Sequence, residues 1–300
     1  MYDIIVVGAG PAGLTAALYA RRAEKSVLII ERSTFGGQMT YSPKIENYPG
    51  YVSLSGNELA DKMVEQVLEQ GAEVEMATVT EIRDEGDVKR VITEDGEFEA
   101  RAVIIATGVK HRMLGLAGEH ELVGHGISFC AVCDGAFYRD MTVAVIGGGN
   151  SALQEALLLS EGCRKVYVIQ NLDVFTGEAS LVNRLREKSN VEFIMGTVVT
   201  DLVSDGELRA IHIKSNCGQE DELKVDGMFV AIGLIPNNAP FSSLAVLNDY
   251  GYFASDETCI TKTPGVFVAG DCRSKTIRQV TTATADGASA ALAACRYLDR

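Results

Sequence analysis

An internal repeat constrains the fold of this chain more than any other feature of its sequence. Residues 8–31 (GAGPAGLTAALYARRAEKSVLIIE) and 147–170 (GGGNSALQEALLLSEGCRKVYVIQ) align over 24 residues without a gap. Each segment follows a short apolar run, has glycine or another small residue at its first, third and sixth positions, and ends in a second apolar run. The pattern predicts a strand, a tight turn, a helix and a second strand, built twice.

The small residues have a physical purpose in such a turn. The first glycine makes the tight turn, the second lets the backbone approach a pyrophosphate, and the sixth residue, Gly13 or Ala152, lets the helix pack close to the strand. The helix N-terminus then offers free N–H groups to a phosphate. Two such motifs in register predict an α/β fold with two Rossmann-like domains. Both helices carry an apolar stripe at matching positions, Leu14, Ala17 and Leu18 in the first and Leu153, Ala156 and Leu157 in the second.

The two copies differ in their last residue. Glu31 ends the first copy, where a carboxylate can accept hydrogen bonds from the ribose of an adenosine. The second copy ends in Gln170, and residues 170–176 contain no lysine or arginine, only the single charge of Asp173. The second turn does not depend on a phosphate, because Ser151 and Gln154 have the spacing of a capping box.

Composition excludes some classes of function. The chain has 300 residues and a net charge of −14, which argues against nucleic-acid binding because phosphate neutralisation needs clustered Lys and Arg. The acidic stretch from Glu81 to Glu99 indicates a solvated hairpin. No apolar run approaches the roughly 20 residues that span a bilayer. We see no secretion signal, and of seven cysteines only Cys130 and Cys133 are closely spaced, so we expect a reducing cytoplasm.

Further motifs narrow the class. In order along the chain come GGQMTYSPKIENYPG, VIIATG, FCAVCDGAFY, FVAIGLIPN and PGVFVAGDCRSKTIRQVTTATADG. Together they resemble the low-molecular-weight thioredoxin reductases, a branch of the flavoproteins with two dinucleotide-binding domains, over essentially the whole chain. The resemblance implies a homodimer, a discontinuous FAD domain at residues 1–114 and 245–300, and a central domain at residues 115–244 that carries the redox CxxC.

The resemblance also implies the flavin contacts. Gly8, Gly10 and Gly13 would contact the pyrophosphate, Glu31 the ribose, and Asp271 the ribityl chain. Gln38 and Asn47 would lie near the flavin, with Arg278 and Gln279 beside its ring system. The remaining expected cofactor residues are Pro11, Ala12, Gly37, Ala106, Thr107, Gly108, Gly270 and Val280. Cys272, which follows Asp271, is interpreted as a small core residue.

The CAVCD segment is the chemical centre. Two residues between Cys130 and Cys133 place the sulfurs within disulfide reach at the start of a helix, which can lower a thiol pKa. Half of a zinc site is the alternative, but it needs a second Cys or His pair that the spacing does not offer, so we expect no metal. By resemblance, Cys133 would face the flavin, Cys130 would attack the substrate disulfide, and Asp134 would carry the proton, which requires burial to raise its pKa. His125 is either a second proton carrier or a structural residue of its turn.

The electron donor follows from residues 170–176. Family members that use NADPH carry His-Arg-Arg-x-x-x-Arg there, and this chain has none of those arginines. A charge-assisted hydrogen bond contributes roughly 1.5–3 kcal/mol, so losing two weakens NADPH binding by about 10² to 10⁴-fold. We therefore do not expect NADPH as a cofactor. The segment is similar to the ferredoxin-dependent branch, which implies that electrons pass from reduced ferredoxin through FAD and the disulfide to thioredoxin.

Other interpretations remain open. Gln170 can still hydrogen-bond a ribose, and Arg184 or Arg186 could reach the site, so an NAD(P)H-dependent thioredoxin reductase is the main alternative. A flavin-dependent dithiol oxidase would consume oxygen with a small dithiol, and a flavin-bearing redox sensor would keep its activity without the cysteines. Docking of an acidic ferredoxin needs a basic patch, to which Lys110, His111 and Arg112 could contribute unless they only end a solvated interdomain strand.

Overall fold

The computed structural model describes residues 1–42 and 44–300, which form two compact units. The first is made of Met1–Lys110 and Ile235–Arg300, and the second is His111–Leu234. These divisions precede the predicted boundaries at 114/115 and 244/245. The later boundary moves because Phe241 and Leu244 are buried in the core of the first unit, whereas Leu114 packs against the core of the second. Strands β7 (Val109–His111) and β16 (Leu234–Pro236) carry the chain across the two divisions.

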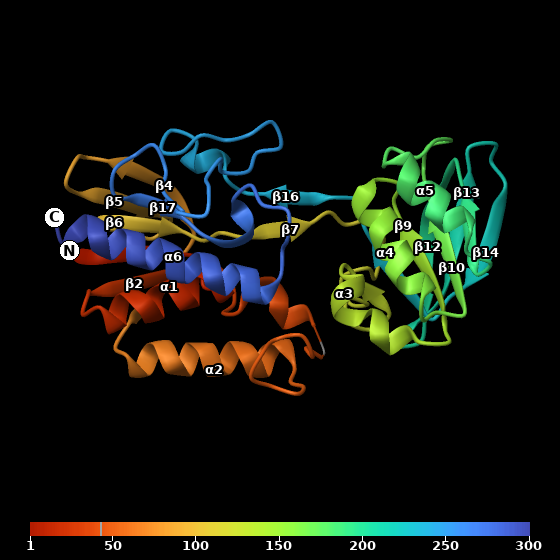
Figure 1. The fold of residues 1–300 in the computed structure, drawn as a ribbon, viewed down its shortest axis with the longest axis horizontal. Coiled ribbons are helices and arrows are strands. Elements are labelled where there is room, and N and C mark those ends of the chain that lie inside the picture. Colours follow the sequence, from red (N-terminus) through yellow and green to blue (C-terminus); the bar gives the residue numbers. More distant parts are fainter. Residues whose placement is uncertain (43) are drawn as a thin grey trace. The chain divides into compact units, whose positions relative to one another are not determined.

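The first unit is built on a seven-stranded sheet (Figure 1). Parallel strands run in the order β3-β2-β1-β6, with β17 also parallel to β6. An antiparallel hairpin, β4-β5, continues from β6 and carries the acidic stretch that the sequence predicted as a solvated hairpin. The strands are β1 (Tyr2–Val7), β2 (Val27–Glu31), β3 (Glu73–Met76), β4 (Val79–Asp84), β5 (Lys89–Thr93), β6 (Glu97–Ile105) and β17 (Val266–Val268).

Alternating side chains of this sheet fill two cores. One face, with Ile4, Val6 and Ile29, packs against α1 (Pro11–Arg22), α2 (Gly56–Glu69) and α6 (Val280–Leu298), which Figure 1 shows lying together. The other face, with Ile5 and Val7, packs against the β4-β5 hairpin and the segment around the 3₁₀ helix η3 (Ala239–Phe241). Gly287 lets α6 approach α1, because a Cβ there would lie 2.2 Å from the Ala12 carbonyl oxygen.

The second unit repeats the parallel arrangement on a smaller scale. Its five-stranded sheet has the order β11-β10-β9-β15-β8, with α4 (Asn150–Ser160) and α5 (Ala179–Arg186) packed into one core. A second core lies between that sheet and an antiparallel sheet of order β12-β13-β14. The strands are β8 (Ile127–Ser128), β9 (Thr142–Ile146), β10 (Lys165–Ile169), β11 (Val191–Ile194), β12 (Thr197–Ser204), β13 (Leu208–Ser215), β14 (Glu220–Lys224) and β15 (Gly227–Val230).

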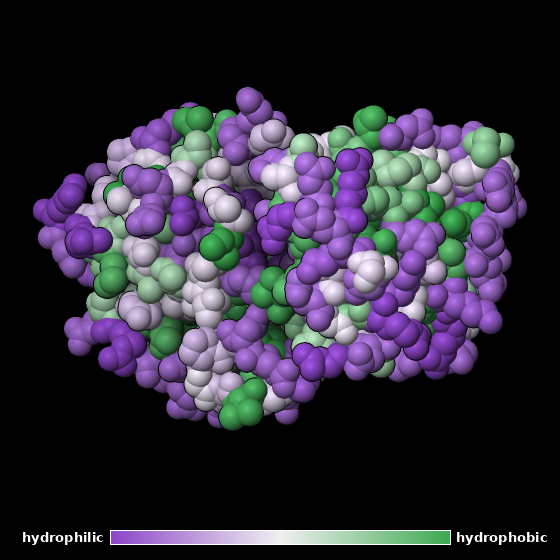
Figure 2. Space-filling view, turned by 45° about the vertical axis from the view of Figure 1, so that its right-hand side comes forward, coloured by the Kyte–Doolittle hydropathy of each residue, from purple (hydrophilic) through white to green (hydrophobic). Residues whose placement is uncertain are grey.

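These two sheets confirm the predicted α/β fold with two Rossmann-like units. The predicted apolar stripes are also confirmed, since Leu14 and Ala17 in α1 and Leu153 and Ala156 in α4 are buried. In the visible face of Figure 2, hydrophilic residues predominate and hydrophobic ones are scattered among them. Within residues 1–42 and 44–300, no helix combines the length and the apolar character that crossing a membrane requires.

Candidate active site

The first glycine turn joins β1 to α1. Gly8 has a φ of +105°, and a Cβ there would lie 2.4 Å from the Ala106 carbonyl oxygen, at the end of β6. Gly13 is equally constrained, because its Cβ would meet the Gly8 oxygen at 1.8 Å. Gly10 is different, since an added Cβ would find no atom within 4 Å. The turn therefore leaves open space at its second glycine, at the N-cap of a helix that begins with Pro11.

Glu31 lies beside this turn at the end of β2. Its Oε2 accepts a hydrogen bond from the Ala9 backbone N–H at 2.8 Å, and its Oε1 accepts from the N–H groups of Arg32 and Ser33 at 2.9 and 3.0 Å. The side chain is held in one orientation by these bonds. A carboxylate has lone pairs to spare beyond them, so it can still accept from a ribose hydroxyl.

The second glycine turn joins β9 to α4 with nearly the same backbone. Gly147 has a φ of +131°, and its Cβ would lie 2.5 Å from the Ala231 carbonyl oxygen at the end of β15. The predicted capping box is wrong: Gly149 is the N-cap and no side chain caps the helix. Instead the Asn150 side chain accepts from the Glu178 N–H at 2.7 Å, which ties the following loop to the turn.

Gln170 closes against this second turn. Its side chain is buried, it donates from Nε2 to the Val174 carbonyl at 3.2 Å, and a Cβ on Gly148 would lie 2.5 Å from its Cδ. The backbone N–H groups of Thr176 and Gly177 both bond the Gly148 carbonyl at 2.9 Å. The Gln170 carboxamide, which hydrogen-bonds the following loop, therefore occupies the position of the Glu31 carboxylate in the first copy.

The redox cysteines lie in the second unit. Cys130 and Cys133 form a disulfide with Cα atoms 5.3 Å apart, and Cys130 is the N-cap of the short helix α3 (Ala131–Asp134). The Cys133 N–H lies 3.2 Å from the Cys130 sulfur. The other five cysteines are free thiols, and Cys272 is fully buried, as predicted. In the part of the chain that the structure describes, no group of three or more His, Cys, Asp or Glu side chains could hold a metal ion.

Asp134 follows the disulfide directly. Its Oδ2 accepts from the Ser128 hydroxyl at 2.6 Å, and that hydroxyl also accepts from the Cys130 N–H at 3.1 Å. Its Oδ1 is buried and has no hydrogen-bond partner among the described residues. Burial raises the pKa of Asp134 and the Ser128 hydrogen bond opposes that rise. A carboxyl with a raised pKa that directly follows the disulfide in the chain is a candidate to donate a proton to a departing thiolate.

Comparisons with known proteins agree with this site. Residues 2–287 match the family model described as pyridine nucleotide-disulphide oxidoreductase. The chain is similar to a thioredoxin reductase of Listeria monocytogenes, with 42% identity over 100% of this chain and 94% of the relative. It is also similar to a 34.2 kDa protein in the rubredoxin operon of Clostridium pasteurianum, with 39% identity over 99% of this chain and 97% of the relative. The structure of thioredoxin reductase from Streptococcus pyogenes superimposes with a TM-score of 0.95, at 41% identity and covering 100% of this chain and 98% of the other.

The chain belongs to the pyridine nucleotide-disulphide oxidoreductase family, in its thioredoxin reductase branch. The predicted family is confirmed at this level. The names of the three relatives do not mention ferredoxin, so the comparisons do not support the predicted ferredoxin-dependent subtype, nor the expectation that NADPH is not a cofactor.

The structure brings the expected flavin residues of this family member together in the first unit. Gly37 and Gln38 start the 3₁₀ helix η1 (Gly37–Tyr41), and a Cβ on Gly37 would lie 3.3 Å from the Gly10 Cα. Asn47 donates to Gln279 at 3.2 Å, and Gln279 is the N-cap of α6, which Val280 begins. Ala106, Thr107 and Gly108 follow β6, while Gly270 and Asp271 form the 3₁₀ helix η4 (Gly270–Cys272).

These residues fit FAD on two observations. Asp271 Oδ1 and Arg278 Nε are buried polar atoms without a hydrogen-bond partner among the described residues, as expected of groups that bond a ligand. The open space at Gly10 admits a pyrophosphate at the start of α1. Arg278 also stacks over the Tyr252 ring at 4.5 Å. Sequence reasoning missed Asn238, which is fully buried, contacts Thr107 at 3.4 Å, and donates to the Cys272 carbonyl at 2.7 Å.

Glu155 is a second carboxyl that sequence reasoning missed. It lies on α4, which packs against α3, and its Oε2 is buried without a partner among the described residues. Burial raises its pKa to about 8, and the charge of Asp134 adds to that rise. The repeat offers a signal, because Glu155 aligns with Ala16, which is fully buried in α1. An acid at a position that the other copy buries is a candidate for an altered pKa.

The predictions for His111 and His125 have different outcomes. His111 stacks on Phe129 with ring centroids 4.5 Å apart, and burial lowers its pKa to about 4. Its suggested contribution to a basic patch is therefore wrong, because it is neutral at physiological pH. The His125 side chain is exposed, and its backbone carbonyl accepts from Leu208 at 3.0 Å, which is a structural role for its turn.

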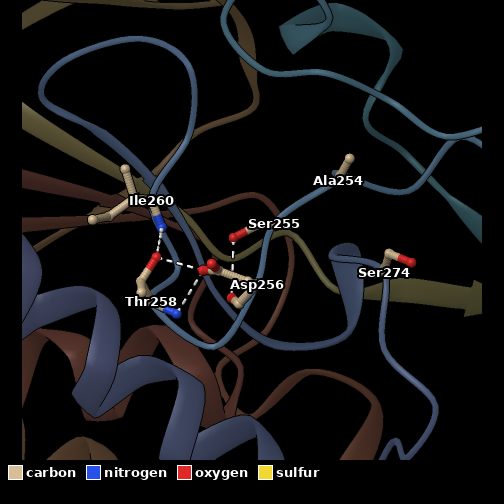
Figure 3. A pocket seen from close by; sticks show the side chains of 6 residues that line it. All are labelled: Ala254, Ser255, Asp256, Thr258, Ile260 and Ser274. Carbon is tan, nitrogen blue, oxygen red and sulfur yellow. Dashed lines mark hydrogen bonds between the residues drawn. The ribbon is translucent and has the colours of Figure 1, made fainter.

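A shallow depression of about 620 Å³ with both polar and apolar lining lies in the first unit (Figure 3). Its lining residues are Ala254, Ser255, Asp256, Thr258, Ile260 and Ser274. None of the expected cofactor residues lines it. Its walls are held by local hydrogen bonds, including Thr258 N–H to the Asp256 carboxylate at 2.9 Å.

Proposed function

We propose that this protein is an FAD-dependent thioredoxin-disulfide reductase that takes its electrons from a reduced ferredoxin. The reductase part rests on one observation: a disulfide lies directly beside a buried carboxyl whose pKa is raised, that of Asp134. Relatives that match the full length and are named thioredoxin reductase support thioredoxin as the substrate.

FAD, when bound, supplies the two-electron chemistry that reduces a disulfide. In this proposal the backbone of Gly8, Gly10 and Gly13 holds the pyrophosphate and Glu31 accepts from the ribose. Asp271 accepts from the ribityl hydroxyls. The remaining residues flank the ring system, namely Gln38, Asn47, Arg278 and Gln279.

The two thiols and Asp134 reduce the substrate. Cys130 attacks the thioredoxin disulfide, which forms a mixed disulfide and expels one thioredoxin thiolate, and Asp134 donates its proton to that thiolate. Cys133 then attacks the Cys130 sulfur, which restores the intramolecular disulfide and releases the second thioredoxin thiol. One dithiol is oxidised and one disulfide is reduced, so the electrons balance.

The donor part of the proposal rests on the loop after Gln170. Asn171, Leu172 and Thr176, which align with the family's arginines, are exposed and uncharged. Asp173 is exposed too and would repel a 2′-phosphate. With Gln170 engaged by Val174, residues 170–176 themselves offer no cation to a phosphorylated ribose.

NADPH is the second candidate, and two observations favour it. The family takes its name from pyridine nucleotides. The N-terminus of α4 also has no side-chain cap, so its N–H groups remain available to a phosphate. The glycine turn does not distinguish the two donors, since it serves the fold in both cases.

A donor assay tests the proposal. Purified protein is mixed anaerobically with thioredoxin and either dithionite-reduced ferredoxin or NADPH, and thioredoxin thiols are counted with a colorimetric disulfide. We expect thiols with ferredoxin and a rate at least about 100-fold lower with NADPH. Equal rates, or thiols with NADPH alone, would overturn the ferredoxin donor. No thiols with any donor, in the presence of bound FAD, would overturn the reductase itself.

The homodimer and the cytoplasmic location belong to the same proposal. The homodimer rests on the family resemblance, and light scattering of the purified holoprotein tests it. The location is supported by five free thiols, four of them buried, which a reducing compartment preserves.

A further inference from the structure

A buried cluster of charges lies next to the expected cofactor residues of the first unit. Asp286, on α6, accepts from Arg273 through Nε at 2.8 Å and Nη2 at 2.9 Å. It also accepts from Lys275 Nζ at 2.8 Å and from the Gly270 N–H at 3.1 Å. Both carboxylate oxygens are therefore bonded, and the side chains of all three charged residues are at most 10% exposed.

The charges of this cluster do not balance without Asp271. Arg273 and Lys275 bring two positive charges and Asp286 brings one negative charge. A buried charge without a partner is expensive. Lys275 Nζ lies 4.0 Å from Asp271 Oδ1, so an ionised Asp271 supplies the missing negative charge.

The same cluster fixes the backbone around Asp271. Asp286 holds the N–H of Gly270, where a Cβ would lie 2.7 Å from the Ala12 Cβ, so η4 packs on the start of α1. Arg273 Nη1 donates to the carbonyls of Ser255 at 3.2 Å and Asp256 at 3.0 Å, in the wall of the depression in Figure 3. Asp271 is thereby held against the glycine turn that is expected to bind the pyrophosphate.

We propose that Asp286 and Lys275 are positioning residues for the flavin. Asp286 holds the Lys275 ammonium beside Asp271, and this ammonium keeps the Asp271 carboxylate ionised and able to accept from the ribityl hydroxyls. The inference rests on the proposed FAD site and adds a residue pair that controls the pH range in which the cofactor is retained.

The direction of the pH effect follows from the groups that face Asp271. These are Lys275, Arg278 and Arg273, which favour the ionised form, and Asp286, which opposes it. Burial raises the pKa of Asp271 to about 6 in spite of the cations. Removal of Lys275 raises that pKa further, so FAD is released at a higher pH as the solution is acidified.

The experiment measures FAD binding rather than turnover. Apoprotein is titrated with FAD between about pH 5 and pH 8, and quenching of FAD fluorescence gives Kd, where a shift of one pKa unit corresponds to about 1.4 kcal/mol. The variants are Lys275→Gln, alone and in an Asp286→Asn background, with Lys275→Arg as the conservative change. Lys25→Gln is the matched control, because Lys25 pairs with Asp299 just beyond the far end of the same helix.

We expect the wild-type Kd to rise as the pH falls through about 6. In Lys275→Gln the midpoint moves up by about one pH unit, which weakens binding about fivefold at pH 6. In the Asp286→Asn background the same Lys275→Gln change moves the midpoint much less, because Lys275 is no longer held beside Asp271. Lys275→Arg and Lys25→Gln keep the wild-type profile. A wild-type midpoint in Lys275→Gln overturns the inference, and so does a full one-unit shift by Lys275→Gln in the Asp286→Asn background. An equal loss of affinity at every pH also overturns it, because that indicates a merely structural role.

A second variant covers the case in which the charge variants do not fold. Asp271→Asn cannot titrate at this position, so its Kd for FAD should be flat over the same pH range. A wild-type pH dependence in Asp271→Asn overturns the inference. Failure of the wild-type protein to bind FAD at any pH is a different result, since it overturns the proposed FAD site itself.

Discussion

The two glycine turns share a backbone and differ at the strand end. In both, the first glycine has a positive φ and lies against the carbonyl that follows a neighbouring strand, Ala106 in one and Ala231 in the other. In both, the following helix starts with the same bond, from Leu14 to Gly10 at 2.9 Å and from Leu153 to Gly149 at 3.1 Å. Only the first strand ends in a carboxylate held by backbone N–H groups.

The difference separates what folds the turn from what selects a ligand. The first glycine is required in both copies because a Cβ there would clash with a neighbouring carbonyl oxygen. In our proposal, selection depends on Glu31 in one copy and on Gln170, with a loop that carries no lysine or arginine, in the other. A glycine-rich turn is therefore evidence of a Rossmann unit, and the strand end is evidence of its cofactor.

The largest expected effect comes from adding a side chain at the third position of each turn, which is Gly10 in the first copy and Gly149 in the second. A Cβ on Gly10 meets no protein atom and its φ of −74° suits any residue, so Gly10→Val should fold but exclude the pyrophosphate. We expect FAD binding to weaken at least about 10⁴-fold. Gly149→Val is the matched control in the other turn and should keep its FAD. Apoprotein titration checks both, and loss of FAD in Gly149→Val would break the comparison.

The next largest effect comes from giving the second copy the family's arginines. Asn171, Leu172 and Thr176 are exposed, so Arg at all three positions should fold. We expect NADPH to gain about 10² to 10⁴-fold as an electron donor. The same triple change to Gln is the control. Stopped-flow reduction by NADPH measures the gain, and no gain over the Gln control would mean that these side chains do not limit nucleotide use.

A smaller effect is expected at Asp134, which lies in the second unit beside the cysteines in the chain and outside its glycine turn. Asp134→Asn should slow thioredoxin reduction about 10²-fold without loss of FAD, because no carboxyl donates to the leaving thiolate. The donated proton is present below the raised pKa of Asp134 and is lost as the pH rises through it. Ser128→Ala removes a hydrogen bond that lowers the pKa of Asp134, so the fall in rate should occur at a higher pH. An unchanged pH–rate profile in Asp134→Asn would contradict the role.

Glu31→Gln makes the first strand end resemble the second. The amide loses one acceptor for the N–H groups of Ala9, Arg32 and Ser33 and a bond to the ribose, so we expect FAD to bind about tenfold more weakly. Gln170→Glu is the reciprocal control and should leave FAD binding unchanged. Equal FAD affinity in Glu31→Gln and wild type would show that the strand end does not hold the cofactor.

The last effect is on stability, not on cofactor or substrate, and concerns Glu155. Its folded pKa of about 8 lies above that of an unfolded glutamate near 4.3, so stability is lost as the pH rises between these values. Glu155→Gln removes this loss and should unfold at a higher urea concentration at pH 8, by a free energy of up to about 5 kcal/mol, against about 1 kcal/mol at pH 5. Gln154→Glu at an exposed neighbouring position is the control. Equal midpoints at pH 8 would contradict the burial of this carboxyl in solution.

The features predicted correctly from the sequence are those that depend on residues close together in the chain. The turns of Gly8 and Gly147, the apolar stripes and the Cys130–Cys133 pair depend on neighbours within a few residues, and these were predicted correctly. His111 could not be predicted, because only the tertiary fold stacks it on Phe129.

The same limit explains the remaining differences. Asp286 meets Arg273 and Gly270 only after α6 has packed, and no spacing in the sequence indicates it. The later domain boundary depends on the burial of Phe241 in a core whose other members are far away in sequence. Ser151 and Gln154 have the spacing of a cap, but Asn150 and Glu178 link the turn to the loop instead.

The central claim is that the second turn no longer selects a nucleotide. The direct measurement is anaerobic stopped-flow absorbance of the flavin band at about 450 nm, with NADPH, NADH or reduced ferredoxin added to the holoprotein. The account predicts fast bleaching by ferredoxin and none within the same time at nucleotide concentrations of tens of micromolar, the order of an ordinary KM. Rapid bleaching by micromolar NADPH or NADH would contradict it.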